Sequence, residues 1–263
     1  MTIPFFSIIM PTHLRPRLLK RALCSLRECT CQDFELLVIS DTGDAETGIV
    51  IAEMLTDNDT YIKRPGQSGP AVSRNIGLQF ARGQRIIFLD DDDAFLPDYL
   101  GTACELSSKN PKAAVYTNYQ IIQEDRERLE MPFATSEHSV KDTPTASVYV
   151  KNFIHNHTVI YPANAVKHRL QDPRLSSLDD WDFLLNVMSE VEFIHEDVGG
   201  PVIYKDYVNI GNRRGSSAEA KGNKVLLDYL SIYSKWPAPT EELKLDRQKL
   251  LSTAGLNAPL DWL

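Results

Sequence analysis

The chain has 263 residues, of which 43% are hydrophobic and 24% charged, a balance that excludes a wholly disordered protein. Its 28 Lys and Arg residues stand against 36 Asp and Glu residues, so the formal net charge is −8 and we expect no nucleic-acid partner. No run of about 18 apolar residues exists, which predicts no transmembrane helix.

Strand and helix patterns alternate through the first hundred residues. Apolar runs at 5–10, 34–40, 61–63 and 86–89 predict strands. Helices are predicted between them, from Pro16 past Leu26, through Ile49 and Met54, and from Gly69 to Gly83. The strand at 86–89 is apolar on both faces, which indicates the centre of a sheet. This order predicts an α/β fold with a doubly wound, mostly parallel sheet flanked by helices, which binds ligands at the carboxyl ends of its strands.

The second half of the chain has a less regular pattern. Strands are predicted at 113–116, 119–123, 158–161, 193–195 and 202–204. The polar stretch 124–145 predicts an exposed hairpin tip or a mobile loop. Ser177 is expected to cap a helix that carries Trp181 and Leu185 on one face.

A C-terminal helical extension is predicted at 221–263, packed on a domain formed by 1–220. Tyr229 and Tyr233 mark one helix that ends before Pro237, and a short last helix begins at Thr240. The apolar face of this extension leaves three options open: packing on the domain, pairing in a homodimer, or peripheral membrane contact.

The four cysteines indicate a reducing compartment. Cys24, Cys29, Cys31 and Cys104 form no Cys-x-x-Cys pair and have no histidine at zinc-ligand spacing. The first residues lack the basic stretch, long apolar core and cleavage site typical of a signal peptide. We therefore expect a cytoplasmic protein.

Four consecutive aspartates, 90–93, follow the central strand directly. Side by side near a core they repel one another, and a divalent cation with oxygen ligands, Mn²⁺ or Mg²⁺, would neutralise them. In an extended segment, Asp90 and Asp92 would face one ligand and Asp91 another. The alternative is a solvated acidic turn without a ligand.

The surrounding motifs resemble the family-two inverting glycosyltransferases of the GT-A fold. The ordered matches are Ile9-Met10-Pro11-Thr12, the strand Glu35-Leu36-Leu37-Val38-Ile39-Ser40-Asp41, the Gly-to-Asn helix start at 69–75, and Phe88-Leu89 before the aspartates. They cover roughly the first hundred residues. The resemblance implies transfer of a sugar from a nucleoside-diphosphate donor, with UDP as the expected nucleotide, to a hydroxyl of a glycan or glycolipid acceptor. It places the nucleotide-binding half at 1–110 and the acceptor-binding half at 111–220, in an enzyme of polysaccharide, lipid-linked oligosaccharide or glycoconjugate biosynthesis.

The same resemblance implies roles for individual residues of the donor site. Pro11 and Thr12 should line the nucleotide pocket, and Asp41 should recognise the base, although Ser40 replaces a second acid of the family pattern. Arg15 should reach the phosphates or simply start a helix, and Arg74 should lie near the diphosphate or buttress the aspartates. Asp92 should bind the metal directly, while Asp90 and Asp91 hold ribose hydroxyls or metal-bound waters.

Asp180 matches the family's general base, in a pair whose first member is Asp179 instead of the usual Glu. The alternative is that these acids only complement a helix N-terminus. His155 and His157 are expected to line the acceptor pocket or to be structural, and Arg213 and Arg214 to close over the diphosphate or to lie in a solvated loop.

Two other functions remain open at this level. A sugar-nucleotide pyrophosphorylase has a related sheet, but its Gly-rich loop with a following Arg and Lys is missing after the first strand. A non-catalytic nucleotide-sugar binding protein would not need both the aspartate cluster and Asp180.

Overall fold

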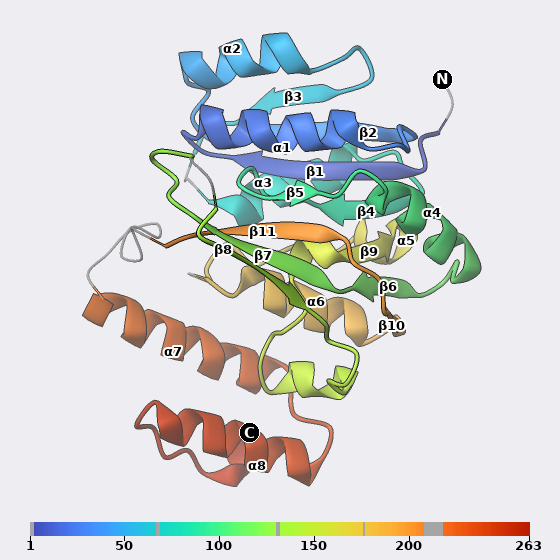
Figure 1. Cartoon of the computed structure of the whole chain (residues 1–263). Helices are drawn as coiled ribbons and strands as arrows, with labels where there is room; N and C mark the ends of the chain where they lie inside the picture. Colours follow the sequence, from blue (N-terminus) through green and yellow to red (C-terminus); the bar gives the residue numbers. More distant parts are fainter. Residues whose placement is uncertain (1–2, 67–68, 130–131, 176, 208–217) are drawn as a thin grey trace.

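The computed structural model describes residues 3–66, 69–129, 132–175, 177–207 and 218–263, with the side chains of the last segment from Lys224 onward. Its central layer is a seven-stranded sheet with the order β10-β6-β9-β4-β1-β2-β3 (Figure 1). The strands are β1 (Phe6–Thr12), β2 (Phe34–Ser40), β3 (Thr60–Lys63), β4 (Arg85–Phe88), β6 (Ala114–Thr117), β9 (Val159–Pro162) and β10 (Phe193–Glu196). Only β9 is antiparallel to its neighbours, and β4 lies in the middle, as predicted.

Helices cover both faces of this sheet because alternate side chains of each strand point to opposite sides. On β1, Ile8 and Met10 join the core beneath α1 (Pro16–Glu28), α2 (Ala45–Met54) and α4 (Tyr99–Lys109). Ile9 joins the other core, beneath α3 (Pro70–Phe80), α5 (Ala163–Val166) and α6 (Asp179–Met188). The predicted doubly wound α/β fold is confirmed.

A second, four-stranded sheet, which the sequence analysis did not predict, has the order β5-β11-β7-β8. Its strands are β5 (Ala94–Phe95), β7 (Tyr119–Glu124), β8 (Ala134–His138) and β11 (Pro201–Asp206). β7 and β8 form an antiparallel hairpin whose second strand is largely exposed, which agrees with the hairpin expected at 124–145. The base of the hairpin differs from that expectation, because Glu124 is buried.

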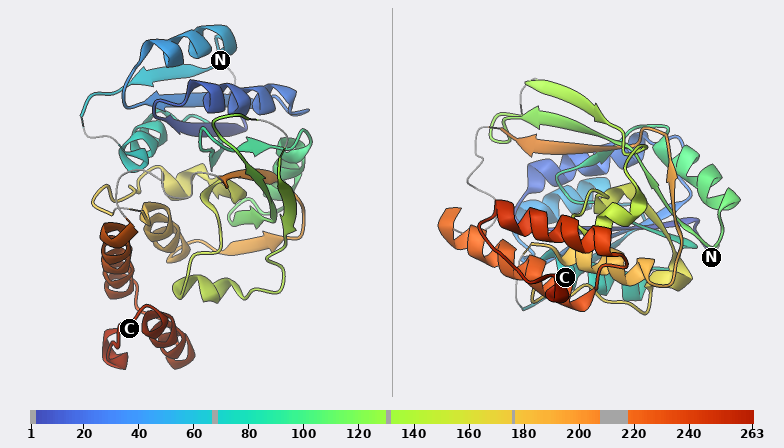
Figure 2. Two further views of the ribbon diagram at one scale, coloured as in Figure 1. Left: turned by 60° about the vertical axis from the view of Figure 1, so that its left-hand side comes forward. Right: turned by 90° about the horizontal axis from the view of Figure 1, so that it is seen from below.

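The chain ends in α7 (Ala218–Lys235), α8 (Glu241–Thr253) and the short 3-10 helix η3 (Leu260–Trp262). Figures 1 and 2 show α7 and α8 together, at the opposite end of the molecule from α2. Tyr229 of α7 packs edge-on against Trp181 of α6 at 5.1 Å between ring centroids, so α7 is attached to the main core. The domain division at residue 220 stays a prediction. None of the described helices is both long and apolar enough to span a membrane.

Ser177 does not cap α6, and that prediction is wrong. The residue before the helix is Leu178, which makes no capping hydrogen bond through its side chain. Ser177 instead donates from its amide and its hydroxyl to Asp228 Oδ2 of α7, at 3.1 and 3.3 Å. The start of α6 is therefore tied to the C-terminal helices.

Gly77 sets the distance between α3 and the sheet. A Cβ at this position would overlap Ile9 Cγ2 and lie 3.2 Å from Ile39 Cδ1. We expect Gly77→Ala to lower the free energy of unfolding by about 1–3 kcal/mol, since overpacking outweighs the better helix propensity of alanine. Urea unfolding measures the change.

Gly48→Ala in α2 is the matched control, because no atom lies within 4 Å of the added Cβ. It should be neutral or stabilising by up to about 1 kcal/mol. Equal stability of the two variants would contradict the close packing of α3 on β1.

Candidate active site

A cavity of about 490 Å³ opens at the carboxyl ends of β1 and β4, between β11 and the start of α6. Of the nine residues predicted to bind the donor or the metal or to act as the base, seven line it: Pro11, Arg15, Arg74, Asp90, Asp91, Asp92 and Asp180. Thr12 and Asp41 are not among its described lining residues. The fold therefore brings most of the predicted site together, including Pro11 and Asp180, which are 169 residues apart in the sequence.

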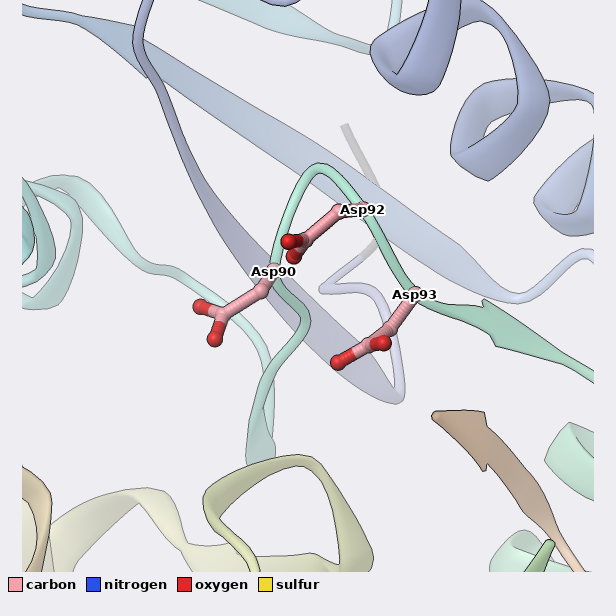
Figure 3. A group of neighbouring side chains, drawn as sticks. All are labelled: Asp90, Asp92 and Asp93. Atoms are coloured by element: carbon pink, nitrogen blue, oxygen red, sulfur yellow. The ribbon is translucent and has the colours of Figure 1, made fainter. Parts of the chain in front are cut away.

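The four aspartates form a tight turn, not the extended segment that the alternation argument assumed. The amide of Asp93 donates to the carbonyl oxygen of Asp90 at 3.1 Å. As a result, carboxylate oxygens of Asp90, Asp92 and Asp93 lie within 4.8 Å of one another (Figure 3). Asp93, which had no predicted role of its own within the run 90–93, thus joins the cluster.

Asp91 points away from this cluster, toward the end of β1. It accepts hydrogen bonds from Thr12 Oγ1 at 2.8 Å and from the amide of His13 at 3.2 Å. Burial, with the neighbouring charge of Asp92, raises the pKa of Asp91 to about 6. Asp91 and Thr12 thereby fix the aspartate turn to β1, and their predicted contacts with the nucleotide stay predictions.

Two arginines and a histidine lie around the cluster of Asp90, Asp92 and Asp93. Arg15 Nη1 lies 2.9 Å and Arg126 Nη1 2.8 Å from Asp92 Oδ2, and His157 Nδ1 lies 3.5 Å from Asp93 Oδ2. The three carboxylates supply only oxygen donors within reach of one centre, which fits a hard divalent cation such as Mg²⁺ or Mn²⁺.

Arg74 connects the aspartate turn to α6. Its guanidinium is buried and lies 2.6 Å from Asp90 Oδ1 and 3.2 Å from Asp179 Oδ2. Burial disfavours the charged form of Arg74, but Asp90 and Asp179 outweigh it and raise its pKa. This geometry matches the buttressing alternative, and contact of Arg74 with a diphosphate stays a prediction.

Asp180 lies in the first turn of α6, where its half-buried carboxylate lines the cavity. Its Oδ1 accepts from the amide of Trp181 at 2.8 Å. Burial, followed by the nearby charge of Asp179, raises the pKa of Asp180 to about 7. A carboxylate with such a pKa can accept a proton near neutral pH.

The other two acids of this turn have partners elsewhere. Asp179 faces Arg74, while Asp182 accepts from Lys235 Nζ and Trp236 Nε1, both at 2.8 Å. Asp182 therefore holds the end of α7.

Asp41 is buried on the far side of β1. Its Oδ1 lies 2.6 Å from His13 Nδ1, and its Oδ2 accepts from the amide of Gly69 at 3.0 Å and lies 3.7 Å from Arg64. Base recognition by Asp41 stays a prediction.

His155 and His157 both line the cavity. Burial lowers the pKa of His155 to about 3 and that of His157 to about 4, so both rings are neutral at physiological pH. Nε2 of His157 and both polar atoms of the Asn156 side chain, Nδ2 and Oδ1, are buried without a hydrogen-bond partner among the described residues. Arg213 and Arg214 lie outside the described residues.

Residues on and around the second sheet also contact the aspartate turn, and the sequence did not single them out. Arg126 Nη2 donates to the carbonyl oxygen of Tyr204 at 2.6 Å, and the amide of Tyr204 donates to Asp93 Oδ1 at 2.9 Å. Arg21 of α1 lies 2.5 Å from Glu124 and donates to the carbonyl oxygen of Asp92. The charged run at 124–128 was the available signal for Arg126.

Comparison with known proteins identifies the family of this chain. The sequence model of glycosyl transferase family 2 matches residues 7–163, which is more than half of the chain. The chain belongs to glycosyl transferase family 2. An uncharacterized glycosyltransferase of Haemophilus influenzae is 25% identical over 233 residues, covering 85% of this chain and 75% of that protein.

Two further similar proteins have names that state a donor or an acceptor. The UDP-Glc:α-D-GlcNAc-diphosphoundecaprenol β-1,3-glucosyltransferase of Escherichia coli is 30% identical over 116 residues, covering 44% of this chain and 46% of that enzyme. The mannosyltransferase of Pyrobaculum calidifontis, solved with GDP-Man and Mn²⁺, superimposes with a TM-score of 0.65 at 16% identity, covering 97% of this chain and 74% of that one. The predicted family and GT-A fold are confirmed.

Proposed function

We propose that this family-2 glycosyltransferase is an inverting, metal-dependent enzyme that uses a nucleoside-diphosphate sugar, with UDP as the expected nucleotide. The observation that carries the proposal is the single cavity lined by both the aspartate cluster and Asp180. Arg74 spans the two, through Asp90 and Asp179. A leaving diphosphate and a general base are needed on opposite sides of one anomeric carbon, and this cavity has acidic groups suited to both tasks.

In the proposed reaction, a hydroxyl oxygen of the acceptor attacks the anomeric carbon of the donor. The bond between that carbon and the diphosphate oxygen breaks, and its electron pair leaves with the nucleoside diphosphate. Asp180 accepts the hydroxyl proton. Attack from the face opposite the leaving group inverts the configuration of the anomeric carbon.

The residues around the cluster suit a bound diphosphate. Asp90, Asp92 and Asp93 would hold Mg²⁺ or Mn²⁺, which neutralises charge on the diphosphate. Arg15 and Arg126 lie beside Asp92 and line the same cavity, so their guanidinium groups would contact phosphate oxygens when Asp92 binds the cation. Asp91 would keep the turn in place through Thr12.

The proposed acceptor is a hydroxyl group of a glycan or a lipid-linked oligosaccharide, and the proposed location is the cytoplasm. Support for the acceptor comes from the Escherichia coli relative, whose name states a GlcNAc-diphosphoundecaprenol acceptor and a UDP-Glc donor.

A donor panel tests this function. UDP-, GDP- and dTDP-sugars are titrated into the protein by calorimetry with Mg²⁺, with Mn²⁺ and with a chelator, and donor hydrolysis is followed in parallel. We expect one nucleotide class to bind and to be hydrolysed slowly, in both cases only with the cation. Failure of every donor to bind or turn over with either metal would contradict the proposal.

Asp41→Ala should weaken nucleotide binding more than it slows the chemical step. Asp41 is proposed to contact a part of the donor that does not react, so its contribution is common to ground and transition states. We expect the Kd for the nucleoside diphosphate to rise by roughly 10–100-fold, the scale of one or two lost hydrogen bonds to a charged group. Asp57→Ala, at an exposed turn, is the control. Unchanged affinity would move base recognition to other residues.

A further inference from the structure

A second cavity of about 530 Å³ adjoins the first, and His155 lines both. It lies between the start of β7, the 3-10 helix η1 (Thr145–Tyr149) and α8. The side chains that matter here combine rings, hydroxyl groups and both signs of charge: Tyr119, Ser147, Lys151, Phe153, His155 and Asp246.

Aromatic and imidazole rings lead from this cavity to the aspartate cluster. Tyr119 meets His155 edge-on at 4.6 Å between ring centroids, and His155 stacks on His157 at 5.8 Å. His157 in turn lies beside Asp93. A molecule that spans both cavities would therefore pass directly over His155.

The wall of the second cavity is fixed by three helices. Trp181 Nε1 of α6 donates to the carbonyl oxygen of Val148 at 2.8 Å, and Tyr233 of α7 donates to that of Val150 at 2.6 Å. Arg247 of α8, which is fully buried, donates from Nε to the carbonyl oxygen of Tyr149 at 2.8 Å. Because Trp181 follows Asp180 in the chain, this wall and the proposed base are held by the same helix.

The lining fits a sugar ring better than a purely apolar ligand. A pyranose presents an apolar face to rings such as Tyr119 and Phe153, and hydroxyl groups to side chains such as Lys151 and Asp246. The volume is within the range of small-molecule sites, about 300–1,000 Å³. The hydrogen-bonded wall means that little ordering is needed when a ligand binds.

We propose that the second cavity is an acceptor subsite, which holds the sugar next to the one whose hydroxyl reacts at Asp180. The inference rests on the proposed function and extends it, since it assigns specificity for a disaccharide to Tyr119, to the segment 147–155 and to Asp246 of α8. In this proposal α7 and α8 support the wall of the subsite, and α8 also lines it through Asp246.

The test compares mono- and disaccharide acceptors. Methyl glycosides of glucose, galactose, N-acetylglucosamine and mannose, each paired with a corresponding disaccharide, are offered with the donor that the protein hydrolyses. In at least one pair we expect the disaccharide to have a KM at least tenfold lower. Phe153→Ala and Lys151→Ala should bring that KM up to the monosaccharide value, with donor affinity within about twofold.

Lys109→Ala, an exposed lysine at the end of α4, is the matched control and should keep the disaccharide preference. Equal KM values within every pair, or a preference that survives both cavity variants, would overturn the acceptor subsite while donor hydrolysis leaves the proposed function standing. If the unsubstituted protein hydrolyses no donor, both the proposed function and the subsite fall.

Discussion

Asp180→Asn should lower turnover by roughly 10²–10⁴-fold, the usual cost of losing a general base, and should leave donor and metal affinity close to normal. The amide keeps the volume of the side chain but no longer accepts the proton. Burial and Asp179 raise the pKa of Asp180 to about 7, and only the ionised carboxylate is a base. Turnover of the unsubstituted protein should therefore rise with pH through about 7, and the variant should lose this dependence. Steady-state rates between about pH 5.5 and 8.5 check both expectations.

Two neighbours provide matched controls for Asp180. Asp179→Asn weakens the contact with Arg74, and Asp182→Asn weakens contacts with Lys235 and Trp236. Both should lower thermal stability more than the rate of the chemical step. A collapse of turnover in either control, with Asp180→Asn nearly active, would assign the base to that neighbour.

Asp92→Asn should largely abolish metal-stimulated turnover, by about 10²-fold or more, while the fold stays intact. The substitution removes one of the three clustered carboxylates. It also leaves Arg15 and Arg126 beside a neutral amide, which weakens their hold on the turn. Turnover is measured against the concentration of Mg²⁺ and Mn²⁺, and circular dichroism checks the fold.

The neighbouring Asp91→Asn is the control for Asp92, because its carboxylate contacts Thr12, His13 and Arg15 and is not one of the three clustered carboxylates. Metal affinity, measured by calorimetry without donor, should fall far less in this variant. If Asp92→Asn retains normal metal-dependent turnover, the metal assignment is wrong.

The sequence predicts the central sheet well because buried parallel strands are continuous apolar runs. β2 at Phe34–Ser40 has the predicted bounds, and β4 takes the predicted central position. The second sheet escapes prediction for physical reasons: β5 is only two residues long, and β8 is polar and exposed, so neither carries a hydrophobic period.

For the candidate site, likewise, residues in local motifs were predicted and residues placed by tertiary contacts were not. Asp90, Asp92 and Asp180 occupy one cavity as the motifs indicate, because strand ends and helix starts gather at one edge of the sheet. The individual role of Asp93 was not predicted because a turn, which local charge patterns do not specify, replaces the extended geometry. Arg126 was missed because its contact with Asp92 depends on the packing of the second sheet.

The anomeric configuration of the first product tests the central claim most directly. The donor that binds is incubated with Mg²⁺ and an acceptor, and proton NMR identifies the configuration of the new glycosidic bond from its anomeric signal. We predict that a donor with an α-linked sugar gives a β-linked product, and that Asp180→Asn forms it far more slowly. An α-linked product would contradict the inverting mechanism and the role of Asp180 as its base.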